Sequence, residues 1–464
     1  MQFKEREKQM EKRNIAIILM SALIVTVLSS CGNSSQENTG ATIYSGEVTA
    51  ENDAKETEEN DTKESEEKGS TYYERGRACL YGLDGQEIDL EAAYTNFEKA
   101  LVLGKTEANY YLGVLYDWYG YPEQDYDKAK TYYEVVGEYP YAQLSLGNLY
   151  YYGQGVGLEE NTEKAQELFE AVIAEGCVEG YLGRGEVART NEDFDTALEC
   201  FNKVLEGEEQ IYIACALSNI ASMYRNGEGV EQDSAKAIEW YEKAADLGYT
   251  SAMSNIGYMY YRGEGVDQNY AQAMEWYGKA ANLGNSNAMD WVGYMYQYGL
   301  SVEQDYTKAM EWYEKAADLG SSSAMNNIAS LYYNGKGVEQ DYAKSMEWYE
   351  KSANLGNASA MTWVGYMYQH EQGVELNYAQ AMEWYKKSAN LGNDSAMNNI
   401  GFMYDNGQGV EQDYAQAMEW YEKAAALGNT SAMNNIGYRY ENGLGVEKNL
   451  SKAQEWYDKA AAAQ

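Results

Sequence analysis

The stretch Ala252-Met253-Ser254-Asn255-Ile256-Gly257 decides the fold, because the chain repeats it at a fixed interval of 36 residues. Lightly edited copies of this hexamer begin at Ala216, Ala288, Ala324, Ala360, Ala396 and Ala432. A Glu-Trp-Tyr triplet keeps the same interval and is centred on Trp240, Trp276, Trp312, Trp348, Trp384, Trp420 and Trp456. A constant period of this size indicates a helical solenoid rather than a closed globular domain.

The apolar spacing within one unit predicts two helices. Ala252, Ile256 and Met259 recur at steps of three and four residues, which places them on one face of a first helix. The glycines of 263–265 should end this helix, because glycine readily takes the left-handed conformation of helix ends. The second helix is expected to begin after a cap at Asn269. Its inward face is predicted to carry Ala273, Trp276, Tyr277 and Ala280.

A glycine recurs inside the first helix, where it costs up to about 1 kcal/mol relative to alanine. It appears as Gly257, Gly293, Gly365, Gly401 and Gly437, with Ala221 and Ala329 as small variants. We interpret this position as a close approach between the two helices of a unit, where a side chain would collide with the partner helix.

Three further expectations concern the connections and the core. Gln272 and Gln416 could complete a capping box at the start of the second helix. Ser301 and Glu371 replace loop glycines, so these two turns could differ from the others. Stacked neighbours should bury the Trp and Tyr faces, and truncation of Trp348 to alanine should then cost about 3 to 5 kcal/mol. The alternative is that the tryptophans form an exposed carbohydrate or cofactor surface.

The N-terminal region predicts export. Ile15 to Leu28 is an apolar run too short for a comfortable membrane span, and Leu28-Ser29-Ser30-Cys31 closes it. This motif resembles a bacterial lipoprotein signal peptide, here residues 1–30. The resemblance implies lipidation of Cys31 and a location in the bacterial cell envelope, with the repeat domain outside the cytoplasm. The alternative is an uncleaved signal anchor, which gives the same side of the membrane.

The rest of the chain divides into three parts. Residues 31–70 are rich in small polar and charged residues, and we expect an acidic disordered tether because such a segment cannot offset its chain entropy by burial. Residues 71–209 hold four degenerate units, and the last of them, from about 177 to 207, lacks the glycine-rich connection. Residues 210–464 hold seven regular units. The prediction is therefore about eleven two-helix repeats of about 36 residues.

The pattern Ala-x-x-x-Ile-Gly-x-x-Tyr, Gly-x-Gly-Val, Asp, Ala-x-x-Trp-Tyr-x-Lys-Ala-Ala, Gly resembles the Sel1-like repeat family, a relative of tetratricopeptide repeats. The match is specific over residues 212–463 and weaker over 71–209. The resemblance implies an all-α, right-handed α-solenoid whose first helices line a concave wall.

By similarity to peptide-binding tetratricopeptide superhelices, asparagines on that wall could clamp an extended peptide, because an amide group both donates and accepts hydrogen bonds. We name the candidate positions the ladder: Asn219, Asn255, Trp291, Asn327, Trp363, Asn399 and Asn435. The residue after the recurring glycine offers aromatic steps: Tyr258, Tyr294, Tyr366, Phe402 and Tyr438. The competing interpretation is that the asparagines only bond neighbouring helices. Alanine at Asn327 and Asn399 should weaken partner capture under the first interpretation and lower stability under the second.

Composition limits the partner and the chemistry. The formal net charge of -39 repels nucleic acid and anionic lipid and favours a basic or neutral protein or peptide, although acid also keeps an extended solenoid soluble. A single histidine, His370, excludes a multi-histidine metal site and argues against a serine-histidine triad. One Ser-x-x-Lys match at 65–68, a nucleophile motif of β-lactam enzymes, lies in the tether and is interpreted as chance.

These observations predict a non-enzymatic, surface-anchored, monomeric scaffold that binds a protein or peptide and uses no cofactor and no metal. One alternative is a hydrolase or binder of β-lactam or cell-wall substrates, as linked to cysteine-rich Sel1-like proteins. Another is a regulatory subunit of a membrane complex. Export permits disulfides, and one bond among Cys177, Cys200 and Cys215 is an open expectation.

Overall fold

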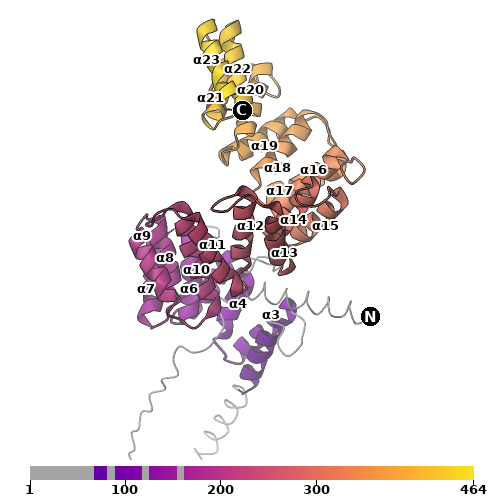
Figure 1. Ribbon diagram of the computed structural model, residues 1–464. Coiled ribbons are helices and arrows are strands. Elements are labelled where there is room, and N and C mark those ends of the chain that lie inside the picture. Colours follow the sequence, from indigo (N-terminus) through magenta and orange to yellow (C-terminus); the bar gives the residue numbers. More distant parts are fainter. Residues whose placement is uncertain (1–66, 81–88, 118–124, 154–160, 464) are drawn as a thin grey trace, which may run out of the picture. The chain divides into compact units, whose positions relative to one another are not determined.

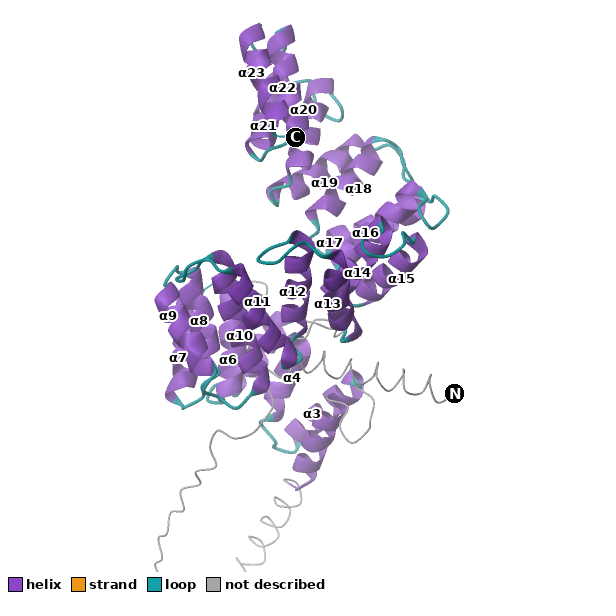
Figure 2. Ribbon diagram, in the orientation of Figure 1, coloured by secondary structure: helices purple, strands orange, loops and turns teal. Residues whose placement is uncertain are grey.

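The computed structural model describes residues 67–80, 89–117, 125–153 and 161–463. Every regular element in these ranges is a helix (Figure 2). The chain divides into two compact units, unit 1 (Met1–Asn285) and unit 2 (Ser286–Gln464), and each is described by itself. Cys31, the signal segment 1–30 and the tether up to residue 66 lie outside the described residues.

Unit 1 is a series of helix pairs that starts with a helix including residues 67–80, so the helical region already covers the last residues assigned to the tether. Its further helices are α3 (Leu90–Val102), α4 (Ala108–Asp117), α5 (Tyr126–Val135), α6 (Pro140–Tyr152), α7 (Thr162–Ala174), α8 (Gly180–Thr190), α9 (Phe194–Val204), α10 (Gln210–Asn226), α11 (Ser234–Asp246), α12 (Thr250–Arg262) and α13 (Tyr270–Asn282).

Unit 2 continues the same pattern with nearly constant helix lengths. Its helices are α14 (Ser286–Tyr298), α15 (Tyr306–Asp318), α16 (Ser322–Asn334), α17 (Tyr342–Asn354), α18 (Ala358–Gln369), α19 (Tyr378–Asn390), α20 (Asp394–Asn406), α21 (Tyr414–Ala426), α22 (Thr430–Asn442) and α23 (Leu450–Ala462). Within each unit, helices that follow one another pack side by side (Figure 1). The described helices form eleven pairs, which confirms the predicted solenoid of about eleven two-helix repeats.

The recurring glycine lies against an aromatic ring, as the sequence predicts. A Cβ atom on Gly365 would lie 2.7 Å from the Tyr385 ring and 3.1 Å from the Ala381 carbonyl oxygen. The Tyr385 ring is fully buried, and its hydroxyl donates to Gln369 Oε1 at 2.7 Å. The same collision would occur in the other regular units that carry this glycine. The glycine therefore allows the second helix to approach closely and place a tyrosine in the core.

The expectation of a buried aromatic pair is confirmed for tyrosine and wrong for tryptophan. Tyr349 is fully buried, whereas Trp348 is only half-buried at the edge of the same core cluster. The Lys351 ammonium lies 4.2 Å from the centre of the Trp348 ring, and a lysine contacts the tryptophan in the same way in every regular unit. A cation over an indole face is an attractive contact. The tryptophans thus pack against the core on one side and carry a lysine on the other.

The turn glycines behave as predicted, and one of the two variant turns changes the end of its helix: α18 ends at Gln369, one residue earlier than the equivalent helices, with His370 as its C-cap. Gly263 ends α12 with φ 73°, in the left-handed region. Ser301 and Glu371 keep the same conformation with φ 62° and φ 56°, although glycine is absent there. The loop geometry is therefore imposed by packing on both sides of the turn, since such angles are unfavourable for side chains with a Cβ atom.

The predicted helix caps are present, but the predicted capping box is not. Asn269 Oδ1 accepts from the Gln272 backbone N–H at 3.1 Å. The Asn269 N–H, which a capping box would use, instead donates to the Tyr260 carbonyl at 2.9 Å, and Asp413 does the same with Tyr404. The caps of the regular second helices are Asp233, Asn269, Asp305, Asp341, Asn377, Asp413 and Asn449.

Polar contacts between side chains 39 residues apart link successive repeats, and the sequence analysis missed them. Arg225 Nε donates to Glu264 Oε2 at 2.8 Å, Tyr333 Oη to Gln372 Oε1 at 2.6 Å, and Gln369 Nε2 to Gln408 Oε1 at 2.7 Å. In each case the end of one first helix reaches the glycine-rich loop of the next repeat. We call these contacts seams.

The cysteines give no support for a disulfide. Cys79, Cys177, Cys200 and Cys215 form no disulfide, so the expected bond among the last three is absent from the structure. Burial raises the pKa of Cys200 and raises that of Cys215 to about 11. Both thiols are therefore protonated and unreactive at neutral pH.

Another polar contact between successive repeats contains a buried charge. Arg439 is 1% exposed at a position where the preceding repeats have Met403 and Met367. Its guanidinium pairs with Asp405 through Nη2 and donates to the Leu444 carbonyl at 3.0 Å. Its Nε atom finds no acceptor among the described residues. A buried ion pair of this kind adds little stability compared with apolar packing, but it is costly to break.

We expect Tyr349→Ala to lower the free energy of unfolding by about 3 to 5 kcal/mol, as for other large buried side chains. Trp348→Ala should cost less, because its ring is only half-buried. Urea denaturation of the two variants, side by side with the parent chain, checks the order. A larger loss for Trp348→Ala would contradict the assignment of tyrosine as the core residue.

For the Asp405–Arg439 pair, Asp405→Gln alone should lower the free energy of unfolding by about 3 to 5 kcal/mol, because it leaves the Arg439 charge buried without a counterion. The double variant Asp405→Gln, Arg439→Met copies the Gln369 and Met403 pair of the preceding repeat. We expect it to be at least as stable as the parent chain, and thermal melts of the three proteins provide the measurement. A double variant no more stable than Asp405→Gln would show that the ion pair itself stabilises the fold.

Candidate functional site

The first helices carry the candidate binding residues on one face. Each aromatic step follows a ladder residue by three positions, so the two are neighbours on the helix surface. In α14 the rings of Trp291 and Tyr294 have centroids 5.4 Å apart, and in α18 the same distance joins Trp363 and Tyr366. The structure places Asn219, Asn255 and Tyr258 in unit 1 and the remaining ladder and aromatic-step residues in unit 2.

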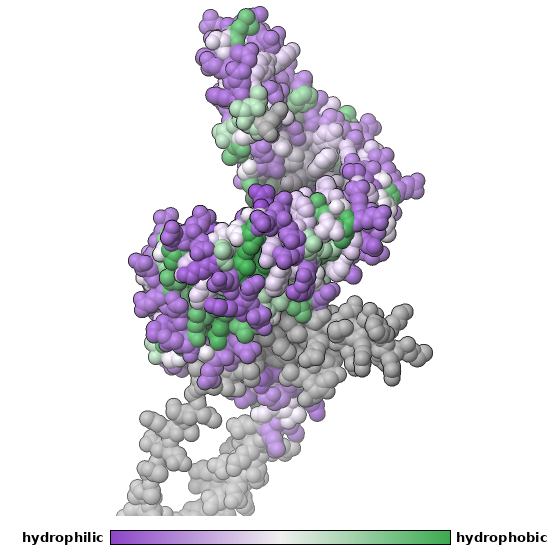
Figure 3. Space-filling model, viewed as in Figure 1, coloured by the Kyte–Doolittle hydropathy of each residue, from purple (hydrophilic) through white to green (hydrophobic). Residues whose placement is uncertain are grey.

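Exposure is uneven along this face. In unit 2, Trp363, Phe402 and Tyr438 are 36%, 42% and 54% exposed, respectively. The ladder asparagines are only half-buried, neither free surface nor core. Hydrophilic residues cover most of the visible surface of each unit, and apolar side chains form small separate patches (Figure 3). The most accessible residues of the predicted binding face are therefore Trp363 of the ladder and the aromatic steps Phe402 and Tyr438, whereas the other aromatic steps are half-buried.

Three ladder asparagines, Asn219, Asn327 and Asn435, bond the first helix of the preceding repeat. Asn327 Nδ2 donates to Asp290 Oδ1 at 2.8 Å, and Asn435 Nδ2 donates to Asn398 Oδ1 at 3.0 Å. These contacts are what the competing, structural interpretation of the ladder expects. Trp363 also packs on the preceding repeat, where it stacks on Tyr349 with ring centroids 5.6 Å apart. A role of these residues in partner binding stays a prediction.

The environment of Asp290 disfavours its charged form. Burial raises its pKa to about 6, and the hydrogen bond from Asn327 opposes that rise. The chain places a neutral asparagine, Asn398, at the equivalent position three repeats later. The hydrogen bond to the ladder residue therefore needs an oxygen acceptor but not a charge.

Unit 1 contains a pocket of about 520 Å³ on the first-helix face. Three successive first helices, α6, α8 and α10, form it together with the α8–α9 turn and the loop after α10. Its lining residues are Tyr151, Tyr152, Glu186, Arg189, Thr190, Glu192, Phe194, Asn219 and Glu228. Asn219 belongs to the predicted ladder, so the pocket adjoins the predicted binding face.

Inside this pocket Glu186 accepts hydrogen bonds on both carboxylate oxygens. Tyr152 Oη donates to Oε2 at 3.1 Å, and Asn219 Nδ2 donates to Oε1 at 3.5 Å. Burial raises the pKa of Glu186, whereas these two hydrogen bonds and the charge of Arg189 lower it. The Arg189 guanidinium itself is held by both oxygens of Glu228 and by Ser222 Oγ at 2.8 Å. This seam fixes one wall of the pocket.

The sequence analysis missed the pocket because it did not establish which glycine of the irregular repeat faces its own second helix. A Cβ atom on Gly183 would meet Phe169 of the preceding repeat, whereas one on Gly185 would lie 2.6 Å from Phe201 of its own second helix. Gly185 is therefore the close-approach glycine of this unit. With that alignment Glu186 takes the position of an aromatic step, which is a signal that the sequence alone contains.

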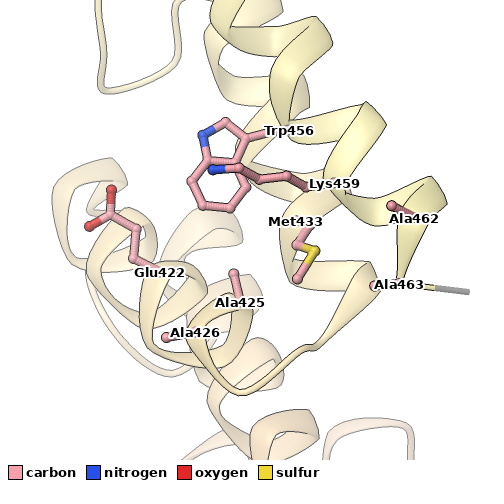
Figure 4. Close-up of a pocket in the computed structure, with 8 residues that line it drawn as sticks. All are labelled: Glu422, Ala425, Ala426, Met433, Trp456, Lys459, Ala462 and Ala463. Carbon is pink, nitrogen blue, oxygen red and sulfur yellow. The ribbon is translucent and has the colours of Figure 1, made fainter.

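A second pocket, of about 500 Å³, lies on the last repeat and is mainly apolar. It is lined by α21, α22 and α23, and the Lys459 side chain crosses the Trp456 ring, with its ammonium 4.1 Å from the ring centre (Figure 4). Met433 and two alanines of α21 form its floor. The pocket thus lies on the last described helix pair and on α21 before it.

Two further observations concern metal binding and membrane-spanning helices in the described residues. They contain no group of three or more His, Cys, Asp or Glu side chains arranged to hold a metal ion. Among the helices in these ranges, none combines the length and apolar character needed to cross a bilayer. His370, the C-cap of α18, is exposed, and its ring centroid lies 4.2 Å from that of Tyr366.

We expect Asp290→Asn to raise the free energy of unfolding at pH 7 by about 1 to 3 kcal/mol, because it removes a charge that the fold disfavours. An acid with a raised pKa in the folded state binds protons more tightly there, so its destabilising effect fades as pH falls from about 6 to about 4. The gain of the variant over the parent chain should fade with it. Urea denaturation at pH 7, 5.5 and 4.5 provides the measurement, and a variant less stable than the parent at all three would contradict the prediction.

Comparisons with known proteins agree with this architecture. The family model described as Sel1 repeat matches residues 70–104, 106–134, 140–176, 216–249, 250–285, 286–321, 322–357, 358–393, 394–429 and 430–464. The helix pair α8 and α9 lies between two of these matches, as expected for the irregular repeat. A search among curated proteins finds no match.

Two solved structures are similar. One is a protective antigen of uropathogenic Escherichia coli strains with an SLR fold, 30% identical, covering 89% of this chain and 87% of that one, with a TM-score of 0.51. The other is a Sel1 repeat protein from Oxalobacter formigenes, 30% identical, covering 53% of this chain and 100% of that one, with a TM-score of 0.47. The chain therefore belongs to the Sel1 repeat family.

Proposed function

We propose that this protein is a non-enzymatic scaffold that binds a protein or peptide along the face formed by its first helices. Sel1 repeat proteins generally mediate protein–protein interactions. The observation that carries the proposal for this chain is the series of exposed aromatic side chains, Trp363, Phe402 and Tyr438, on that face of unit 2. Aromatic residues supply large contact areas at low entropic cost, and they are enriched in protein interfaces.

The charge of the protein supports a basic or neutral partner. The formal net charge of -39 attracts positively charged segments and repels nucleic acid and anionic lipid over the range of the Debye length. Complementary charge mainly accelerates encounter and excludes wrong partners, while the aromatic contacts supply affinity. Binding should therefore weaken in high salt without being abolished.

The same proposal places the scaffold at the surface of a bacterial cell. The motif that ends at Cys31 supports cleavage and lipidation at that residue, and the acidic segment that follows would hold the repeats away from the membrane. Both lie outside the described residues. A regulatory subunit of a membrane complex would have the same anchor and the same repeats and would differ only in its partner.

In-cell photo-crosslinking tests the proposed face. A crosslinking amino acid at Phe402 or Tyr438 should capture one and the same protein, because both side chains are exposed on neighbouring first helices. Matched positions on the second helices of the same repeats, Glu419 and Glu455, are exposed too and should not capture it. Mass spectrometry identifies the captured protein and also shows whether Cys31 carries lipid.

Two outcomes would overturn the proposal. Capture of the same protein from Glu419 and Glu455 would place binding on the wrong face. Turnover of β-lactam or cell-wall substrates by the purified full chain, retained in the Phe402 and Tyr438 variants, would favour the hydrolase alternative.

A further inference from the structure

The pocket of α6, α8 and α10 differs chemically from the rest of the first-helix face. In the regular repeats the residue after the close-approach glycine is most often aromatic, whereas the irregular repeat has Glu186 there. One step of the aromatic series is thus replaced by a half-buried carboxylate. An inference about its ligand rests on the proposed function, because it concerns the same face and the same bound partner.

The short connection of the irregular repeat borders the pocket. Only residues 191–193 join α8 to α9, whereas seven residues, 263–269, join α12 to α13. The glycine-rich loop of a regular repeat packs on the second helix of the repeat before it, as Gly229 does on Phe194. The irregular repeat has no such loop, and its short turn places Glu192 in the pocket lining together with Phe194.

The charges in the pocket do not balance. Arg189 and Glu228 neutralise each other through a two-point contact. Glu186 and Glu192 form no ion pair with any lysine or arginine of the described ranges. The donors to Glu186 are neutral groups, Tyr152 and Asn219, which stabilise a carboxylate without supplying a counterion.

The walls of the pocket favour a cation with an apolar stem. Tyr151 and Tyr152 meet edge to face with ring centroids 4.8 Å apart, and Phe194 adds a third ring to the lining. Aromatic faces attract lysine and arginine heads and also pack against their methylene groups. An anionic ligand fits poorly, because the Arg189 guanidinium is already occupied by Glu228 and two further carboxylates would repel it.

We propose that this pocket receives a basic side chain, lysine or arginine, of the protein or peptide bound on the first-helix face. The cationic head lies beside the Glu186 carboxylate, and the stem packs against Tyr151 and Phe194. Arg189 is already paired with Glu228, so a ligand cation would give Glu186 an ion pair of its own. The pocket would then fix the register of the partner, since one charged side chain has to meet one position along the face.

Defined peptides test this proposal on the purified full chain. The probes are seven-residue alanine peptides, acetylated and amidated, with lysine, arginine, Nε-acetyl-lysine or norleucine at the centre, titrated by calorimetry up to about 10 mM. We expect the lysine or arginine peptide to bind at least about tenfold more tightly than the norleucine peptide, as for one charge-assisted contact. The order of lysine and arginine identifies the preferred head group.

Two variants test whether the preference for cationic peptides depends on Glu186. Glu186→Gln keeps an oxygen acceptor for Tyr152 and should remove most of the preference for the cationic peptides. Glu239→Gln makes the same change in net charge on an exposed site of α11 outside the pocket and should leave that preference intact. Circular dichroism melts confirm that both variants are folded.

The outcomes separate this inference from the proposed function. Equal binding of lysine and norleucine peptides, an equal effect of the two variants, or no binding by the parent chain overturns the pocket assignment, even where crosslinks from Phe402 and Tyr438 support the scaffold. A lysine or arginine preference that Glu186→Gln removes supports the pocket, even where those crosslinks fail and the scaffold proposal falls.

Discussion

The contact between a small residue in the first helix and an aromatic ring in the second is the constraint on which each repeat depends. Where Gly365 lies against Tyr385, the two helices approach so closely that a Cβ atom would collide with the ring. The tyrosine can then be buried completely, and its hydroxyl needs a partner because an unsatisfied buried hydroxyl is costly. Gln369 supplies that partner and passes a second hydrogen bond to Gln408 in the next repeat. Packing within one repeat is thereby coupled to the alignment of its neighbour.

Sequence reasoning could reach the fold because the signals that define it are local and repeated. The spacing of Ala252, Ile256 and Met259 gives a helix face, and the glycines at 263–265 and the cap at Asn269 give its boundaries. It failed where a side chain has two plausible roles. Both members of the Trp348 and Tyr349 pair are large and apolar, and only the direction of each ring decides which is buried.

The candidate site was less predictable because it depends on contacts between repeats. The ladder positions do share one face, but nothing in the sequence shows that Asn327 bonds Asp290. The pocket lies at the irregular repeat, where Glu192 of the short α8–α9 connection joins its lining, and a repeat analysis gives least weight to such exceptions. Glu186 could have been found by aligning on Gly185, since that glycine faces the ring of Phe201.

The seams have a consequence for how such a chain can evolve. Nearly identical repeats invite unequal recombination, which would delete or duplicate one unit without disturbing its helices. The seams are not interchangeable, however: Arg225 meets Glu264, while Tyr333 meets Gln372. Loss of the single repeat that contains Glu264 would bring Arg225 opposite Leu300 and leave its guanidinium without an acceptor at that boundary. Differences among otherwise similar units therefore oppose such deletions, because the new boundary would leave a polar group without its partner.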